Sequence, residues 1–183
     1  MYWKSTRTEK FSIMNNREIF SLMRSHAGTR NVLVGVFALD TVPKYHEKLS
    51  RSRAYIINTD ISSGGGEHWI CIYFPLYGMP EYFDSYGGSP MVYSNLIALM
   101  GLPFRKNNIR LQNYLSTTCG QYCMTYIYMR HVCHYSMNDV IKHLLSKRPN
   151  VDEYVNLFVE RMFQTDLDVQ DANFLHKQLS RLT

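Results

Sequence analysis

The sequence of 183 residues predicts a single α+β domain that spans residues 1–183. Three observations support this class. The first half holds short β-branched and aromatic runs of strand length, and the second half holds longer segments with apolar residues at helical spacing. Hydrophobic residues make up 45% and charged residues 19%, a balance that argues against disorder. The N-terminus has no apolar signal region, and the four cysteines are therefore expected to be reduced thiols in an intracellular, non-secreted protein.

The first half predicts one helix and then a series of strands. Apolar side chains recur at helical spacing over residues 17–25, after Asn15 and Asn16, which are good helix caps. Strands are expected at residues 32–37, 54–58, 69–74, 81–84 and 109–111. The run 69–74 is apolar throughout, which indicates a strand buried on both faces. A turn rich in Pro and Gly links it to 81–84, so these two strands are expected to form a hairpin.

The second half predicts helices. Residues 118–131 are apolar on nearly all sides, which is typical of a central, enclosed helix. A capping-box pattern at Ser136 and Asp139 opens a second helix that ends before Pro149. Further helices are expected at residues 152–163 and, more weakly, at 172–182.

Cys119 is the candidate nucleophile. It falls in the first turn of the enclosed helix, where free backbone N–H groups and the positive end of the helix dipole favour a thiolate. Gly120 beside it is expected to let a substrate backbone approach closely. Taken alone, a cysteine in this position is more often a buried structural residue.

Three other residues supply suitable partners. His68 immediately precedes the buried strand, and Asp84 ends the next strand of the hairpin, so both are expected at the same end of the sheet. An imidazole there is suited to act as the base for a thiol, with the carboxylate orienting it. Gln112 closes the expected strand 109–111, seven residues before Cys119, and its amide is expected to join the Cys119 backbone N–H in an oxyanion hole.

A metal site is the alternative use of the sulfur and imidazole groups Cys119, Cys123, His131 and His134. On one helix, however, Cys123 and His134 lie about 16 Å apart at 1.5 Å per residue, too far to share an ion. The sequence therefore predicts neither a metal nor a required cofactor, and Cys71 and Cys133 are expected in the core.

Several motifs resemble the adenovirus-type cysteine endopeptidases, which related viruses and large DNA transposons also encode. The resemblance covers roughly residues 30–135 and rests on GGEHW at 65–69, YFDSYG at 82–87, LQ at 111–112 and TCGQYC at 118–123. It implies a papain-like fold of the adenain and ubiquitin-like-protease type, in which a mixed central sheet packs between helices and the nucleophile begins a buried helix. It also implies His68 as base, Asp84 as orienting acid, Gln112 as oxyanion donor and Cys119 as nucleophile.

The same resemblance implies an endopeptidase, expected to be a monomer, that cleaves after Gly in extended peptides. Such an enzyme would mature capsid or core precursors in a virion, host nucleus or cytoplasm. Two departures matter. Asp84 stands where the best-known adenoviral enzymes have Glu, and Asp is the acid of the SUMO and ubiquitin-like-protein proteases, which remain the alternative. No cysteine lies between Cys71 and Cys119, so the disulfide-linked activating peptide of adenoviral enzymes cannot be carried over, although a peptide or DNA activator remains open.

The net charge of +5 is uneven, because residues 1–53 hold ten Lys or Arg against four Asp or Glu. This basic third predicts either non-specific DNA binding or merely a solvated surface. A non-catalytic DNA-binding relative that keeps the fold is therefore a second alternative. No run approaches the roughly 18 apolar residues of a membrane helix, and no membrane partner is expected.

Overall fold

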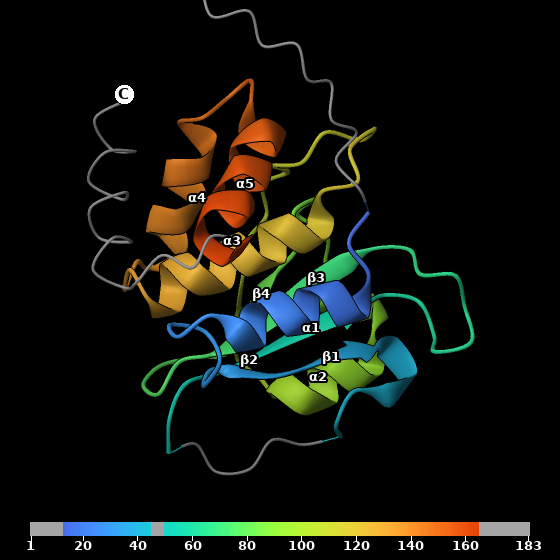
Figure 1. Ribbon diagram of the computed structural model, residues 1–183. Coiled ribbons are helices and arrows are strands. Elements are labelled where there is room, and N and C mark those ends of the chain that lie inside the picture. The colour runs from blue at the N-terminus through green and yellow to red at the C-terminus, as the bar shows by residue number, and fades with distance from the viewer. Residues whose placement is uncertain (1–12, 45–49, 165–183) are drawn as a thin grey trace, which may run out of the picture.

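A computed structural model describes residues 13–44 and 50–164, and it has the expected α+β architecture (Figure 1). A five-stranded mixed sheet has the order β1-β2-β3-β4-β5. The strands are β1 (Leu33–Ala38), β2 (Arg53–Asn58), β3 (Trp69–Phe74), β4 (Glu81–Phe83) and β5 (Arg105–Lys106). The two outer pairs, β1–β2 and β4–β5, are parallel, whereas β3 is antiparallel to both of its neighbours. The predicted β3–β4 hairpin is thus confirmed.

Helices cover both faces of this sheet. They are α1 (Asn16–Ser25), α2 (Ser94–Met100), α3 (Cys119–His131), α4 (Met137–Leu145) and α5 (Val151–Val159). Figure 1 shows α1 and α3 against one face, with α4 and α5 outside α3, and α2 against the other face. Two short 3-10 turns, Leu39–Thr41 and Pro90–Val92, and a π turn, Glu160–Gln164, complete the described part of the chain. None of the helices described is long and apolar enough to cross a membrane.

The sheet separates two apolar clusters, and β3 contributes to both. Cys71 and Tyr73 pack with α1, α3 and α5, whereas Ile70 and Ile72 pack with α2. Every residue of β3 is buried, so the prediction of a strand buried on both faces is confirmed. Burial of this whole strand fixes the position of its first residues, which adjoin the candidate site.

Helix α3 is enclosed as predicted, because all its residues from Cys119 to Met129 are buried. A charged pair fastens its far end to the sheet: Arg130 Nε lies 2.6 Å from Glu81 Oε2, and Tyr126 donates a hydrogen bond of 2.7 Å to the same oxygen. The predicted caps of α1 and α4 are also present as capping boxes, Asn15 with Glu18 and Ser136 with Asp139.

Three expectations about the secondary structure differ from what is found. The strand expected at 109–111 is wrong, because isolated hydrogen bonds hold this segment, from Asn107 Nδ2 to Ile109 O and from Leu111 N to Ser85 O, and the fifth strand is instead Arg105–Lys106. Helix α2 was not predicted; it has only seven residues and no side-chain cap. The helix expected at 152–163 ends at Val159 and continues as the π turn. The helix expected at 172–182 lies outside the described residues.

Candidate active site

His68 and Asp84 meet at one end of the β3–β4 hairpin, as the sequence predicted. His68 directly precedes β3 and Asp84 directly follows β4, and the antiparallel register that pairs Cys71 with Phe83 brings them together. His68 Nε2 lies 2.7 Å from Asp84 Oδ1, and the two side chains are only 15% and 9% exposed. A largely desolvated pair of this kind is suited to holding an imidazole in one orientation and one tautomer.

The backbone after Asp84 anchors its carboxylate. Tyr86 N donates to Oδ1 at 2.8 Å, and Gly88 N donates to Oδ2 at 3.1 Å. Asn107 binds the main chain of Asp84 on both sides, because its Oδ1 accepts from Asp84 N and its Nδ2 donates to Asp84 O. These bonds hold the Asp84 carboxylate in place independently of its contact with His68.

Cys119 is the first residue of α3, and it lines the cleft beside the imidazole of His68, whose pKa it influences. Because Asp84 occupies Nε2, the nitrogen left for the thiol is Nδ1. Burial alone would lower the pKa of His68, but the hydrogen bonds from Asp84 and Cys119, together with their charges, raise this pKa to about 9. The imidazole is thus protonated at neutral pH, as an imidazolium between two acidic groups.

Tyr86 is a site residue that the sequence analysis missed. Its ring stacks on that of His68, with centroids 4.7 Å apart and planes 29° apart. Tyr114 stacks in turn on Tyr86 at 6.1 Å, and the guanidinium of Arg110 lies 3.6 Å from the centre of the Tyr114 ring. An aromatic face against an imidazolium stabilises its positive charge. Tyr86 sits in a turn, where no periodicity distinguishes it from other polar turn residues.

Gln112 lies near the site but is positioned differently from the expectation. It does not end a strand; it is a buried residue of the irregular segment that leads to α3. Its Oε1 accepts a hydrogen bond of 2.6 Å from Ser85 Oγ, and its Nε2 donates to Ser116 O at 2.9 Å. One N–H of the amide therefore remains for another acceptor, and the Ser85 bond fixes which end of the amide carries it.

The helix start at Cys119 has no side-chain cap, and the expectation about Gly120 needs correction. Thr118 occupies the N-cap position of α3, but its hydroxyl does not cap the helix and instead donates to Asp152 Oδ1 at 3.0 Å. Gly120 does not leave room for a substrate. A Cβ at this position would lie 3.1 Å from Ile19 Cδ1 and 3.5 Å from Trp69 Cδ1, so its absence lets α1 and β3 pack closely against α3.

A cleft of about 560 Å³ opens onto Cys119 and His68. Its walls are the start of α1, the end of β1, and the loop that leads into β3, together with Tyr86, Ser116 and Thr117. Part of that loop is glycine, and a Cβ added to Gly65 would meet nothing within 4 Å. The cleft therefore offers an extended chain a route past the thiol.

The remaining cysteines differ from Cys119 in their surroundings. All four are free thiols. Cys71 and Cys123 are buried in the core between the sheet and α3, and burial raises the pKa of Cys123. Burial also raises the pKa of Cys133, to about 11. Within the described ranges, no group of three His, Cys, Asp or Glu side chains is arranged to hold a metal ion.

The comparisons with known proteins name no family for this chain. No family model matches the chain, and no curated protein matches its sequence. Among solved structures, the chain is similar to the ASFV pS273R protease, with 27% identity and a TM-score of 0.43, over 62% of this chain and 44% of that one. It is also similar to the central domain of the uncharacterized Lpg1148 protein from Legionella pneumophila, with 14% identity and a TM-score of 0.46, over 82% of this chain and 97% of that domain.

A protease is therefore among the solved structures that this chain resembles, and the chain spans less than half of that protease's length. Neither comparison distinguishes an adenovirus-type enzyme from a ubiquitin-like-protein protease.

Proposed function

We propose that this chain is a cysteine endopeptidase. The observation that carries the proposal is the set of three groups at the cleft: the Cys119 thiol, the neighbouring His68 imidazole whose pKa it helps to raise, and the Asp84 carboxylate 2.7 Å from that imidazole. This is the arrangement on which thiol hydrolases rely, because the imidazole takes the proton of the thiol and the carboxylate holds the resulting imidazolium.

The reaction we infer starts from the Cys119 thiolate and the His68 imidazolium. The thiolate attacks the scissile carbonyl, and the oxyanion is stabilised by the backbone N–H of Cys119 and the free N–H of Gln112 Nε2. His68 then gives its proton to the leaving amine, which departs and leaves a thioester on Cys119. Finally, His68 removes a proton from water, and the resulting hydroxide hydrolyses the thioester.

The substrate we propose is an extended segment with Gly before the scissile bond. The sequence resemblance supports this choice, since a residue without a Cβ can approach the Cys119 thiol most closely. The natural substrates we propose are capsid or core precursors of a DNA virus or a virus-like transposon.

Cleavage of a peptide library tests the reaction. The wild-type protein should cut after Gly, Cys119→Ala should be inactive, and Cys123→Ala, changed one helical turn away, should retain activity. A preference for bulky residues before the cut would contradict the proposed substrate. Normal cleavage by the Cys119→Ala protein would contradict the proposed nucleophile.

A protease of ubiquitin-like proteins is the second candidate, and the observation that favours it is Asp, not Glu, at position 84. Such an enzyme draws its binding energy from a folded partner and should cut short peptides poorly. Assays of intact SUMO and ubiquitin-like precursors beside the short Gly peptides separate the two. Cleavage confined to the precursors would favour this second candidate.

DNA is a further partner that we propose from the basic residues 1–53. Binding independent of sequence should weaken steeply with salt, with a log–log slope of about −0.9 per neutralised phosphate. Adding DNA to the peptide assay tests activation at the same time. No binding at low salt would remove DNA both as a partner and as an activator.

A further inference from the structure

The cleft differs in charge from the chain as a whole. The chain as a whole is basic, with a net charge of +5. Yet no Lys or Arg is found among the described residues that line the cleft, and Glu67 is the one carboxylate there. Its other ionisable lining groups are Cys119, His68 and Tyr86. A ligand in the cleft therefore meets one negative charge with no Lys or Arg beside it, because the lining imidazolium of His68 is already paired with Asp84.

Two nearby carboxylates are already engaged in building the same wall. Asp60 accepts hydrogen bonds from Ile61 N at 2.8 Å and Gly66 N at 2.9 Å. Asp40 accepts from Ser62, from its backbone N at 2.8 Å and from its hydroxyl at 2.7 Å. The carboxylate of Glu67, by contrast, is exposed and has no hydrogen-bond or ion-pair partner within residues 13–44 and 50–164. It is the acidic group of this wall that remains available to a ligand.

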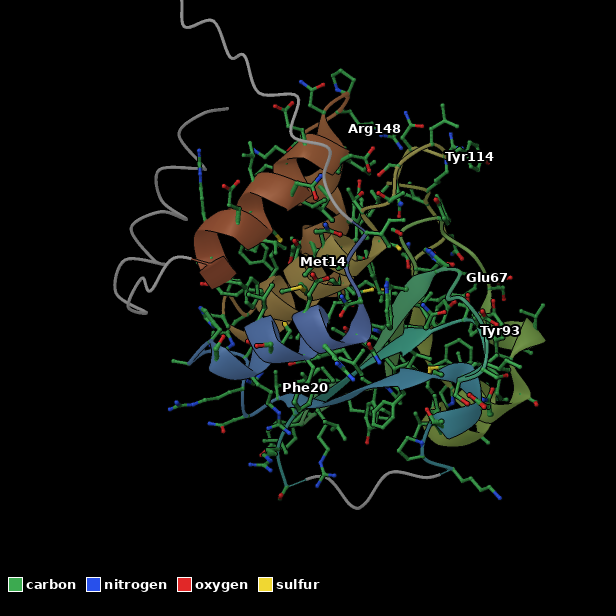
Figure 2. The ribbon with its side chains drawn as sticks, turned by 45° about the vertical axis from the view of Figure 1, so that its right-hand side comes forward. Met14, Phe20, Glu67, Tyr93, Tyr114 and Arg148 are labelled. Atoms are coloured by element: carbon green, nitrogen blue, oxygen red, sulfur yellow. The ribbon has the colours of Figure 1, made fainter. Side chains whose placement is uncertain are left out.

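The backbone holds Glu67 in a defined place beside the imidazole. Its N–H donates to Asn58 Oδ1 at 3.1 Å, and the carbonyl of the next residue, His68, accepts from Thr59 N at 2.8 Å. Gly66 supplies the turn before it with a φ of +84°, a conformation that other residues rarely adopt. Figure 2 shows Glu67 on the loop that leads into β3. A side chain next to the catalytic base borders the residues that flank a scissile bond.

We propose that Glu67 is a specificity-determining residue that selects a Lys or Arg side chain close to the scissile bond. This inference rests on the proposed protease function and adds the charge of the substrate to it. Because Glu67 is exposed, the attraction is moderated by solvent, and we expect a three- to tenfold preference over a neutral residue. The preference should fall as salt rises, since salt screens exposed charges.

Single-lysine scanning of a neutral parent peptide that contains the Gly site tests this inference. For the wild-type protein, Lys at one position within a few residues of the cut should raise kcat/KM three- to tenfold over Gln. Glu67→Gln should abolish the ratio between the Lys and Gln peptides, whatever its effect on the parent, and Glu67→Lys should favour Glu at the same position. Glu160→Gln, which removes an exposed carboxylate outside the cleft, should behave like the wild type.

Binding to the Cys119→Ala protein gives a readout that does not depend on cleavage. The Kd of the Lys peptide should be three- to tenfold lower than that of the Gln peptide, and adding Glu67→Gln should make the two equal. An equal preference for Lys with and without Glu67 would overturn the inference. If the peptides bind with the expected charge preference but the wild-type protein never cleaves them, the proposed protease function fails and the role of Glu67 in ligand selection stands.

Discussion

The β3–β4 hairpin and the segment 107–118 both bring side chains to the cleft, but they hold them by different means. In the hairpin, backbone pairing between buried strands places His68 and Asp84. In the segment 107–118, regular secondary structure is absent, and Gln112 is held by single side-chain bonds to Ser85 and Ser116.

This difference predicts which side-chain substitutions each region should tolerate. A strand ladder survives the loss of one side chain, because its hydrogen bonds belong to the backbone. A segment held by buried polar side chains does not, because removing one partner leaves the other unsatisfied. Apart from the pH-dependent contribution of the His68 charge, changes in the hairpin should therefore affect chemistry with little effect on stability, whereas changes in the segment should affect both.

The largest effect is expected in the hairpin. His68→Ala removes the proposed base and should lower kcat/KM for a Gly peptide by about 10²- to 10⁴-fold. Above pH 9, where the charge of His68 no longer contributes to stability, the melting temperature should change little, since the strand ladder does not use this side chain. Peptide cleavage and thermal unfolding of the same preparation check both parts, and activity within tenfold of the wild type would exclude His68 as the base.

Gln112→Ala should cost about 10²- to 10³-fold in kcat, because one of the two proposed oxyanion donors is lost. Ser85→Ala leaves the amide in place but removes the bond that orients it, so a smaller loss of roughly tenfold is expected, together with lower stability from the unpaired Oε1. Steady-state kinetics and denaturant unfolding of the two variants measure this. If Ser85→Ala were as active and as stable as the wild type, the segment would not depend on its side-chain bonds.

Asp84→Asn tests whether the carboxylate at the end of the hairpin raises the pKa of His68. Without the carboxylate, burial dominates, and this pKa should fall from about 9 toward or below 6.5. NMR titration of the His68 ring would record the change, with the Tyr86→Phe protein, which keeps the stacked ring, as a control that stays near the wild type. An unchanged midpoint in Asp84→Asn would show that Asp84 does not set the charge of the imidazole.

The same pKa has a consequence for stability. A histidine whose pKa is raised on folding stabilises the native state fully below pH 6.5, its ordinary value, and this contribution is lost as pH rises through about 9. The free energy of unfolding of the wild type should therefore decline more over this window than that of His68→Ala.

The smallest effect concerns the start of α3. Thr118→Val removes the hydroxyl that donates to Asp152 and should lower the free energy of unfolding by about 1–3 kcal/mol. Thr117→Val, at an exposed neighbour, should change it by less than about 0.5 kcal/mol. Equal stability of the two variants in denaturant unfolding would contradict the role given to the Asp152 contact.

The same contrast explains what could be predicted from the sequence. The run 69–74 and the apolar segment 118–131 carry strong patterns, and from these the strand, the enclosed helix and the shared end for His68 and Asp84 follow directly. The segment around Gln112 has no such pattern. Its path depends on Asn107, which binds the main chain of Asp84 from 23 residues away, a contact that no local preference indicates.

Tyr86 and Gly120 are single residues whose roles the sequence pattern could not predict. Tyr86 gains its role only because the turn after Asp84 folds over the imidazole. The helix start was predicted correctly, but which side of it Gly120 faces depends on where α1 packs. Periodicity locates elements along the chain, and the contacts between elements decide which small residues face a substrate and which face the core.

Covalent trapping of Cys119 tests the central claim most directly. A short peptide whose C-terminal Gly carries a thiol-reactive electrophile, followed by intact mass measurement and peptide mapping, reports nucleophile and binding site together. We predict one adduct per chain, on Cys119, at the same rate in Cys123→Ala and much more slowly in His68→Ala. An adduct on Cys133 or another thiol in place of Cys119, or equal labelling of Cys119 with and without His68, would contradict the account.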